Sequence, residues 1–243
     1  MRVAALYDIH GNLPALEAVL DDVRTAGVDS IVIGGDVVPG PLPRETLACL
    51  EALEIPVRFL HGNGESAVLA ELAGKDSTVP APFRELIRWS ARQLEPEQQR
   101  SMARWPSTVR VAIPELGDVL FCHATPRSDT EIFTRLTPEE RVAPALAGVD
   151  APLVICGHTH MQFDRMVGSI RVLNAGSVGM PFGEPGAYWL LLGPDVQFRH
   201  TTYDLADAAD RIRRTSYPQA AEFATRDILK PRTEQEMLDA FSR

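Results

Sequence analysis

Short apolar runs alternate with helical patterns through the first 60 residues. Between the first two runs, apolar residues recur every three or four positions, which predicts a helix that ends near Gly27. Strands that alternate with helices are typical of βαβ units, whose strands run parallel. We therefore expect a parallel sheet that contains the strands Arg2–Tyr7, Ser30–Ile33 and Pro56–Leu60, with a second short helix over Thr46–Leu53.

Along the rest of the chain, two segments have mainly helical patterns. Residues 64–105 carry helical patterns broken by prolines and no good strand, and the tail after Asp204 is helical again. Thr137, followed by proline and glutamate, predicts the start of a helix. Thr233 and Glu236 form a second capping-box pattern. The strands expected between these helical segments are Thr108–Ala112, Asp118–Cys122, Leu153–Cys156, Ile170–Leu173, Ala187–Leu192 and Val196–Tyr203.

Aspartate, histidine and asparagine residues stand directly after several apolar runs. In an open α/β sheet, ligands bind outside the carboxyl ends of the strands. Five segments therefore bring acidic, imidazole and amide side chains toward one edge, and glycines between them allow backbone and ligand to approach closely. The segments are Asp8-Ile9-His10-Gly11-Asn12, Gly34-Gly35-Asp36, His61-Gly62-Asn63-Gly64-Glu65, His123, and Gly157-His158-Thr159-His160.

Two of these carboxylates, Asp8 and Asp36, follow neighbouring strands and would repel each other if both were buried and ionised. A divalent cation between them removes the repulsion. Imidazoles and carboxylates suit zinc, manganese and iron. Two metals about 3.5–4 Å apart, sharing one carboxylate, can clamp a phosphate and generate a bridging hydroxide.

Composition narrows the classes of protein that remain. The chain has 243 residues, and its 24 Lys and Arg against 33 Asp and Glu give a net charge of −9, which disfavours a nucleic-acid-coating surface. No apolar run approaches the length of a membrane span. Three widely spaced cysteines fit reduced thiols. We expect a cytoplasmic location, because the early acidic residue Asp8 does not fit a signal peptide.

The ordered motifs closely resemble those of the calcineurin-like metallophosphoesterase family. That family's pattern is Asp-x-His, Gly-Asp, Gly-Asn-His-Asp/Glu, a lone His and Gly-His-x-His, and all five blocks occur in order between residues 8 and 160, with one departure. Asp8–Leu20 and residues 174–179 look most like the small bacterial and archaeal phosphodiesterase branch. The resemblance implies an α/β fold, a four-layer α/β/β/α sandwich of two mixed sheets flanked by helices. We expect one such domain over residues 1–243.

The resemblance also implies a role for each motif residue. Asp36 would bridge two divalent metal ions (Mn, Fe, Zn, Ni, Co or Mg), and the hydroxide between them would attack phosphorus. Asp36, His10 and Asn63 would be catalytic residues, and Asn63 would also bind substrate. The first metal would be held by Asp8, His10, Asp36 and His160, and the second by Asp36, Asn63, His123 and His158.

One position departs from the family pattern. The family often has a His after Gly-Asn, where it stabilises the phosphate or protonates the leaving group, and this chain has Gly64 there. Arg127, four residues after His123, is our candidate for a substitute catalytic and substrate-binding residue, because a guanidinium fits a phosphate. His61 is a second candidate, although a local hydrogen bond is the favoured interpretation of that residue.

Several other polar residues are expected to be structural. Glu65 is expected to cap the following helix rather than to support the site from behind. Buried, inert thiols are expected at Cys122 and Cys156. Backbone hydrogen bonds near the site are expected from Asn12, Asn174 and Ser177, and exposure is expected for His200.

These observations predict a metal-dependent hydrolase of phosphoric esters, most specifically a phosphodiesterase of a small phosphoester. The alternatives are a phosphomonoesterase, a protein or dinucleoside-polyphosphate phosphatase, or a non-catalytic scaffold of the same fold. Residues 64–105 are expected to rim the metal cleft as a helical insertion, and residues 204–243 to form a C-terminal helical extension. No membrane partner is expected, nucleic acid would enter only as a phosphodiester substrate, and a homo-oligomer is left open.

Overall fold

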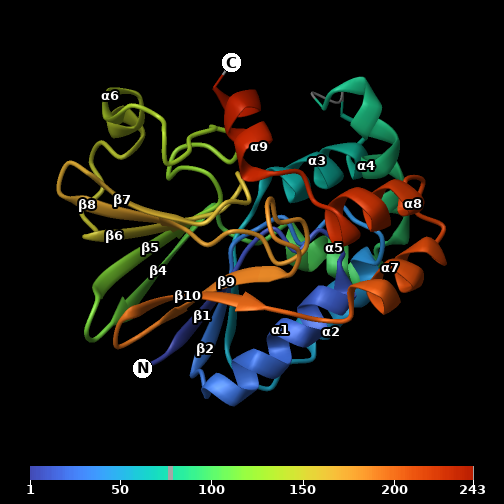
Figure 1. Ribbon diagram of the computed structural model, residues 1–243, viewed down its shortest axis with the longest axis horizontal. Coiled ribbons are helices and arrows are strands. Elements are labelled where there is room, and N and C mark those ends of the chain that lie inside the picture. The colour runs from blue at the N-terminus through green and yellow to red at the C-terminus, as the bar shows by residue number, and fades with distance from the viewer. Residues whose placement is uncertain (76–78, 243) are drawn as a thin grey trace.

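The computed structural model describes residues 1–75 and 79–242, which form two five-stranded sheets (Figure 1). The first sheet has three parallel strands at its centre and one edge, as the alternation of strands and helices predicts, with two antiparallel strands added on the other side. Its order is β10 (Val196–Thr201), β9 (Ala187–Leu192), β1 (Val3–Leu6), β2 (Ser30–Ile33) and β3 (Val57–Phe59).

The second sheet has the same mixed character. Its three inner strands run parallel, and an antiparallel strand closes each edge. Its order is β4 (Thr108–Ile113), β5 (Gly117–Cys122), β6 (Leu153–Cys156), β8 (Ile170–Asn174) and β7 (Phe163–Val167).

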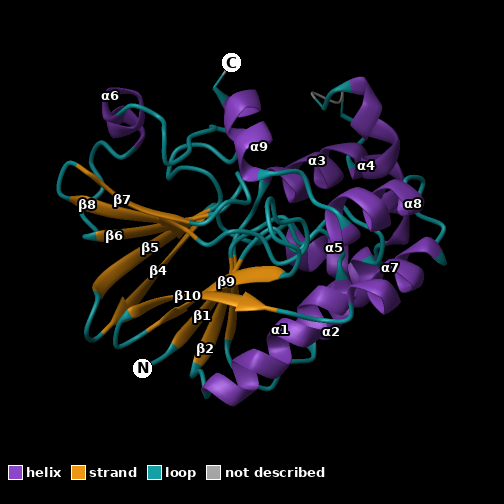
Figure 2. Ribbon diagram, viewed as in Figure 1, coloured by secondary structure: helices purple, strands orange, loops and turns teal. Residues whose placement is uncertain are grey.

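Alternate side chains of β1 show how the layers are formed. Val3 and Ala5 pack between the two sheets, while Ala4 and Leu6 face the helices that cover the first sheet. A third apolar cluster covers the opposite face of the second sheet and includes Phe133 from the segment after β5. The fold is therefore the expected four-layer α/β/β/α sandwich of two mixed sheets (Figure 2).

The helices fall into three sets. The crossover helices of the first sheet are α1 (Leu13–Ala26) and α2 (Pro43–Glu51). The segment between β3 and β4 forms α3 (Asn63–Leu72), α4 (Ala81–Gln93) and α5 (Pro96–Met102). The remaining helices are α6 (Glu139–Val142), α7 (Leu205–Arg213), α8 (Ala220–Phe223) and α9 (Glu234–Phe241), with a short 3₁₀ turn at Ala143–Ala145 and a π-helix at Ala224–Leu229.

Some local predictions are confirmed and others are wrong. Gly27 ends α1 with a left-handed φ of 61°, and Thr233 forms the expected capping box of α9. The helix expected after Thr137 does begin at Glu139, but it has only four residues. Thr137 does not cap it, because the Thr137 hydroxyl accepts the N–H of Thr134. The edge strand β7 was not predicted. No helix in the described part of the chain is long and apolar enough to cross a membrane.

Candidate metal centre

The loops after β1, β2, β3, β5 and β6 meet where the two sheets come together. Backbone hydrogen bonds connect them, including Asp8 N–H to Gly35 O (3.1 Å) and Gly157 N–H to His123 O (2.8 Å). The structure thus brings together the seven predicted metal ligands from five separate segments. We call them the ligand cluster: Asp8, His10, Asp36, Asn63, His123, His158 and His160.

Five members of the ligand cluster have a left-handed backbone. They are the only non-glycine residues with positive φ among those the structure describes. This conformation costs an L-residue about 1–2 kcal/mol and persists only where surrounding contacts impose it, most often at functional sites. The φ values are 53° for Asp8, 49° for His10, 53° for Asp36, 66° for His158 and 58° for His160.

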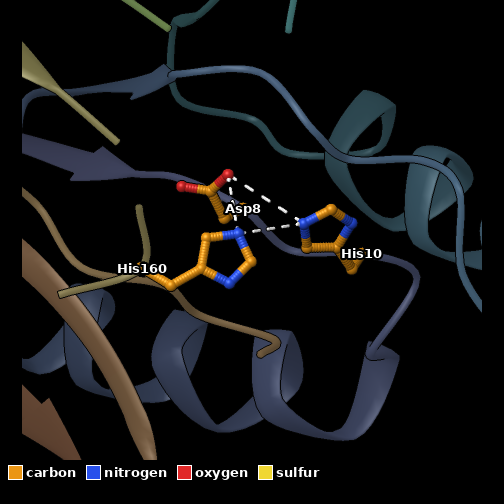
Figure 3. Close-up of side chains that lie close together, drawn as sticks. All are labelled: Asp8, His10 and His160. Atoms are coloured by element: carbon orange, nitrogen blue, oxygen red, sulfur yellow. Dashed lines mark hydrogen bonds and ion pairs between the residues drawn. The ribbon is translucent and has the colours of Figure 1, made fainter. Parts of the chain in front are cut away.

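Asp8, His10 and His160 form a first compact group (Figure 3). Asp8 Oδ1 lies 3.3 Å from His160 Nε2 and 3.9 Å from His10 Nε2, and the two Nε2 atoms are 3.3 Å apart. Asp8 is fully buried, and the side chains of His10 and His160 are only 11% and 10% exposed. One cation can therefore contact all three side chains.

The second ring nitrogen of three cluster histidines faces a backbone carbonyl. A carbonyl only accepts hydrogen bonds, so Nδ1 carries a proton, and in the neutral form of each ring Nε2 is the nitrogen that can offer a lone pair to a cation. This carbonyl support is the usual arrangement of metal-binding histidines. The distances are 2.7 Å from His160 Nδ1 to Met180 O, 2.9 Å from His123 Nδ1 to Gly34 O, and 3.3 Å from His10 Nδ1 to Pro39 O.

Asp36 lies between the two halves of the ligand cluster. Its Oδ2 is 3.7 Å from His10 Nε2, and its Oδ1 is 3.6 Å from His123 Nε2, so each oxygen faces a different histidine. Asp8, Asp36 and His123 form a second compact group. Asn63 joins this group, because its Oδ1 is 3.0 Å from His123 Nε2.

His158 belongs to neither compact group of three. Its backbone N–H donates to Asp8 Oδ2 (2.9 Å), and its ring lies edge-on to that of His123 with centroids 5.1 Å apart. The structure therefore brings His158 beside the second group without placing its ring nitrogens in the compact cluster.

The environment of Asp8 Oδ1 indicates whether a metal ion fits the site. This oxygen is buried, and no described residue is hydrogen-bonded to it. Leaving a buried acceptor without a partner costs about 1–3 kcal/mol. Since the Nε2 lone pairs of His10 and His160 also converge beside it, a divalent cation would satisfy all these atoms at once. The donor set therefore fits a metal ion.

Burial and neighbouring charges shift the pKa values within the ligand cluster. Burial, with the charge of Asp8 adding to it, raises the pKa of Asp36 to about 6. Burial lowers the pKa of His10 to about 3 and that of His158 to about 4, which keeps both rings neutral at pH 7. Burial opposes ionisation of Asp8, but the surrounding imidazoles hold its pKa below the usual range. Neutral imidazoles and an ionised carboxylate are the forms that bind metals.

Glu65 caps α3 and also fixes the loop that carries Asp36. Its Oε2 accepts the N–H groups of Gly62 and Asp36, both at 2.8 Å, and its Oε1 accepts that of Val38 at 3.1 Å. The predicted capping role is confirmed, and support of the site from behind, the less favoured alternative, is found as well. Burial raises the pKa of this carboxyl to about 7, and the charge of Asp36 contributes.

Three further polar side chains hold the loops through backbone carbonyls. Their predicted role in anchoring these loops is confirmed. The hydrogen bonds run from Ser177 Oγ to Asp8 O (2.7 Å), from Asn174 Nδ2 to Gly157 O (2.6 Å) and from Asn12 Nδ2 to Gly179 O (2.9 Å).

The backbone at Gly64 leaves no room for a side chain. Its N–H donates to Asp36 Oδ1 at 2.6 Å. A Cβ at this position would lie 2.1 Å from Val38 O and 2.9 Å from Asp36 Oδ1. The close packing of α3 against the Asp36 loop is therefore compatible with glycine at this position and not with the family histidine.

Arg127 and His61 line a polar cavity of about 260 Å³ together with His123. The exposed guanidinium of Arg127 pairs with Glu131, and its catalytic role stays a prediction. Nε2 of His61 lies 3.0 Å from Met102 O, in agreement with the structural role favoured for it.

An apolar pocket of about 480 Å³ also reaches the ligand cluster. Helices α3 and α4, from the segment 64–105, line it together with His10, Asp36 and Asn63. Polar residues in its wall are Ser66, Asp129 and Thr130, and apolar ones include Pro39, Ala67, Ala70, Pro80, Phe83, Leu86 and Ile87.

The sequence did not predict an aromatic contact with the first compact group. Phe182 stacks on the ring of His160, with centroids 5.4 Å apart and planes 19° apart. Phe241 of α9 packs against Phe182 at 6.4 Å. The C-terminal extension therefore contacts the site indirectly, because Phe241 packs on Phe182 and Phe182 stacks on His160. The only sequence signal for Phe182 is its position shortly after the Asn174–Gly179 turn.

The fold and the ligand cluster together define a metallophosphoesterase-type sandwich. Residues 1–193 match the model of the calcineurin-like phosphoesterase superfamily domain, and the chain belongs to this superfamily. Membership supports hydrolysis of phosphoric esters and binding of divalent metals, for which the Asp and His groups described above are available.

Individual proteins also resemble this chain in sequence or in fold. A metallophosphoesterase from Sphaerobacter thermophilus is 29% identical, with a TM-score of 0.71 over 93% of this chain and 97% of that one. A protein from Pyrococcus horikoshii OT3 has a TM-score of 0.78 at 21% identity, over 92% and 97% of the two chains, and shows the fold alone. An uncharacterised protein of Methanocaldococcus jannaschii is 27% identical, over 89% of this chain and 94% of that protein.

Proposed function

We propose that this chain is a phosphodiesterase whose ligand cluster holds two divalent metal ions. The observation that carries the proposal is the buried Asp8 Oδ1, which accepts no hydrogen bond from any described residue and lies 3.3 Å from His160 Nε2 and 3.9 Å from His10 Nε2. Asp8, His10, Asp36 and His160 would hold one ion, and Asp36, Asn63, His123 and His158 the other. Such ions, when bound, supply an activated water and neutralise charge on the phosphoryl oxygens.

The protein's own residues would orient these groups and the substrate. Asp36 has one oxygen toward each half of the cluster, and the Gly64 N–H and Glu65 fix that orientation. Asn63 lines the apolar pocket, so its amide nitrogen can donate to a phosphoryl oxygen of a bound ester. His10 lines the same pocket beside the reacting group. Arg127 would contact the substrate from the polar cavity.

Charge around the site favours a diester over a monoester. A phosphodiester carries one negative charge at pH 7, whereas a monoester carries about 1.5–2. Among the residues described as lining the apolar pocket, none is Lys or Arg, and Asp36 and Asp129 are present. On this side of the cluster the protein therefore offers no cationic side chain to balance a second charge.

The glycine at position 64 affects which leaving groups the site can handle. Gly64 removes one general acid, and the surrounding backbone leaves no space for its replacement at that position. We therefore expect faster hydrolysis of esters with good leaving groups. Phosphatases that keep the histidine at this position are the weaker alternative.

Hydrolysis of bis-p-nitrophenyl phosphate and of p-nitrophenyl phosphate tests the proposal. The protein would be stripped of metal, reloaded with Mn²⁺ and compared with its Asp36→Asn variant. We expect metal-dependent turnover that favours the diester and is lost in the variant. Preference for the monoester would support the phosphomonoesterase alternative, and no turnover by the metal-loaded protein would support a scaffold.

We also propose that the protein works in the cytoplasm on a small phosphoester. All three cysteines, Cys49, Cys122 and Cys156, are free, and burial raises the pKa of the last two thiols, as expected of inert core residues. A disulfide found in the protein isolated from its own cells would contradict this location.

A further inference from the structure

The apolar pocket has two kinds of surface in one cavity. His10, Asp36 and Asn63, all members of the ligand cluster, line it together with apolar side chains of α3 and α4. A phosphoester held at the cluster would therefore place one of its organic groups beside these helices. The volume of about 480 Å³ is within the range of small-molecule sites, about 300–1,000 Å³.

The shape of the pocket depends on small residues on α3 and a large one on α4. Ala67 and Ala70 are three positions apart, so they share one face of α3, and both line the cavity. Phe83 of α4 lines the same cavity and is 53% exposed, although it is a large apolar side chain. An apolar ligand group would cover part of the Phe83 ring. Each methylene of such a group that is removed from water should increase affinity about fourfold.

The charge of the pocket excludes other occupants. No described lining residue is Lys or Arg, and Asp129 adds a carboxyl whose neighbour Ser66 donates to it at 2.7 Å. A second phosphate, a carboxylate or a nucleic-acid backbone would lose its hydration here without gaining a cationic partner. A neutral apolar group meets no such cost.

We infer that the apolar pocket between α3 and α4 is the specificity subsite for an uncharged aliphatic or aromatic ester group of the substrate. The natural substrate is then a phosphodiester with at least one such group, rather than a polyphosphate or a polynucleotide. The inference takes its reaction from the proposed function, but the selectivity rests on the pocket alone.

Binding of non-hydrolysable analogues tests the subsite separately from catalysis. The probes are dimethylphosphinate, butyl(methyl)phosphinate, methyl(phenyl)phosphinate and 2-carboxyethyl(methyl)phosphinate, which have no P–O–C bond, and they are titrated calorimetrically into the Mn²⁺-loaded protein. We expect affinity to rise about tenfold or more from methyl to butyl, and the carboxyethyl probe to bind no better than the methyl one. The butyl and phenyl probes distinguish an aliphatic from an aromatic occupant.

Three variants assign the effect to the pocket. Ala70→Phe should fill the cavity and remove the butyl and phenyl advantage while leaving the methyl probe unchanged, and Phe83→Ala should reduce the advantage. Leu72→Ala is the matched control, because Leu72 is an exposed apolar residue of α3 outside the pocket lining. Leu72→Ala should leave the affinities of all four probes unchanged.

Equal affinity for all four probes, a preference for the carboxyethyl probe, or a full butyl advantage in Ala70→Phe would overturn the inference, as would no binding of any probe. If the diester is not hydrolysed but the butyl advantage and its loss in Ala70→Phe are found, the proposed catalysis fails and the subsite stands.

Discussion

The ligand cluster and the apolar pocket share three residues but are constructed in different ways. Cluster residues follow strands of both sheets, five of them have left-handed backbone, and their loops are fixed by hydrogen bonds between distant segments. The rest of the pocket is lined mainly by ordinary helical residues of two consecutive helices. If the proposed function holds, the fold common to the superfamily would position the metal ligands, while the segment 64–105 would select which ester fits. Changes in the two regions should therefore have different consequences.

The largest effect is expected for Asp36→Asn, because it removes the carboxylate that faces both halves of the cluster. Turnover of every diester should fall by about 10³-fold or more, whereas Phe83→Ala should alter only the preference among esters. Steady-state kinetics with the Mn²⁺-loaded proteins measures both. Asp118→Asn, at an exposed position of β5, is the matched control and should retain full activity.

Gly64→Ala tests the close packing behind the cluster. A Gly-to-Ala change within a helix usually stabilises a protein by about 0.5–1 kcal/mol. Here the new Cβ would meet Val38 O, and we expect the free energy of unfolding to fall by about 2 kcal/mol or more. Denaturant unfolding of the metal-free protein measures this change. Stabilisation by Gly64→Ala would show that the Asp36 loop is not held as tightly as described.

Asp36→Asn should lower turnover, but it should increase the folding stability of the metal-free protein. The pKa of Asp36 is raised to about 6 in the folded state, against about 3.9 in an unfolded chain. Its ionisation therefore destabilises the folded state above pH 6, and this cost disappears as the pH falls below 4. We expect the variant to be more stable than wild type by about 1–3 kcal/mol at pH 7 and equally stable near pH 4. A difference that is independent of pH would exclude this origin.

The smallest effect is expected for Arg127→Ala, on the polar side of the cluster. Loss of one charged hydrogen bond to phosphate should lower kcat/KM by about tenfold, and Arg127→Lys should restore part of it. The exposed pair with Glu131 contributes only about 0–1 kcal/mol to stability, so thermal unfolding should barely change. Unaltered kcat/KM in Arg127→Ala would remove this residue from the proposed mechanism.

The sequence predicted that the cluster residues would lie close together, because these residues directly follow strands. β2 (Ser30–Ile33) and β6 (Leu153–Cys156) have the predicted bounds, and once parallel strands are placed side by side their ends must meet. The edge strand β7 was not predicted, because Asp164 and Arg165 interrupt its apolar pattern and pairing with β8 forms it.

Other features depend on contacts between distant segments. The clash that requires Gly64 involves Val38, on another loop. The stacking of Phe182 on His160 joins residues with no common pattern. The pocket between α3 and α4 was expected only as a helical rim, because its depth follows from the packing of two helices rather than from either one.

The central claim is that the ligand cluster holds two metal ions that share Asp36. Titration of the metal-stripped protein with Mn²⁺, followed by electron paramagnetic resonance, counts the ions and detects magnetic coupling between neighbours. We predict two ions per chain with a coupled signal in the wild type, and loss of the coupled signal in Asp36→Asn. No bound Mn²⁺ in the wild type, or an unchanged coupled pair in Asp36→Asn, would contradict the claim.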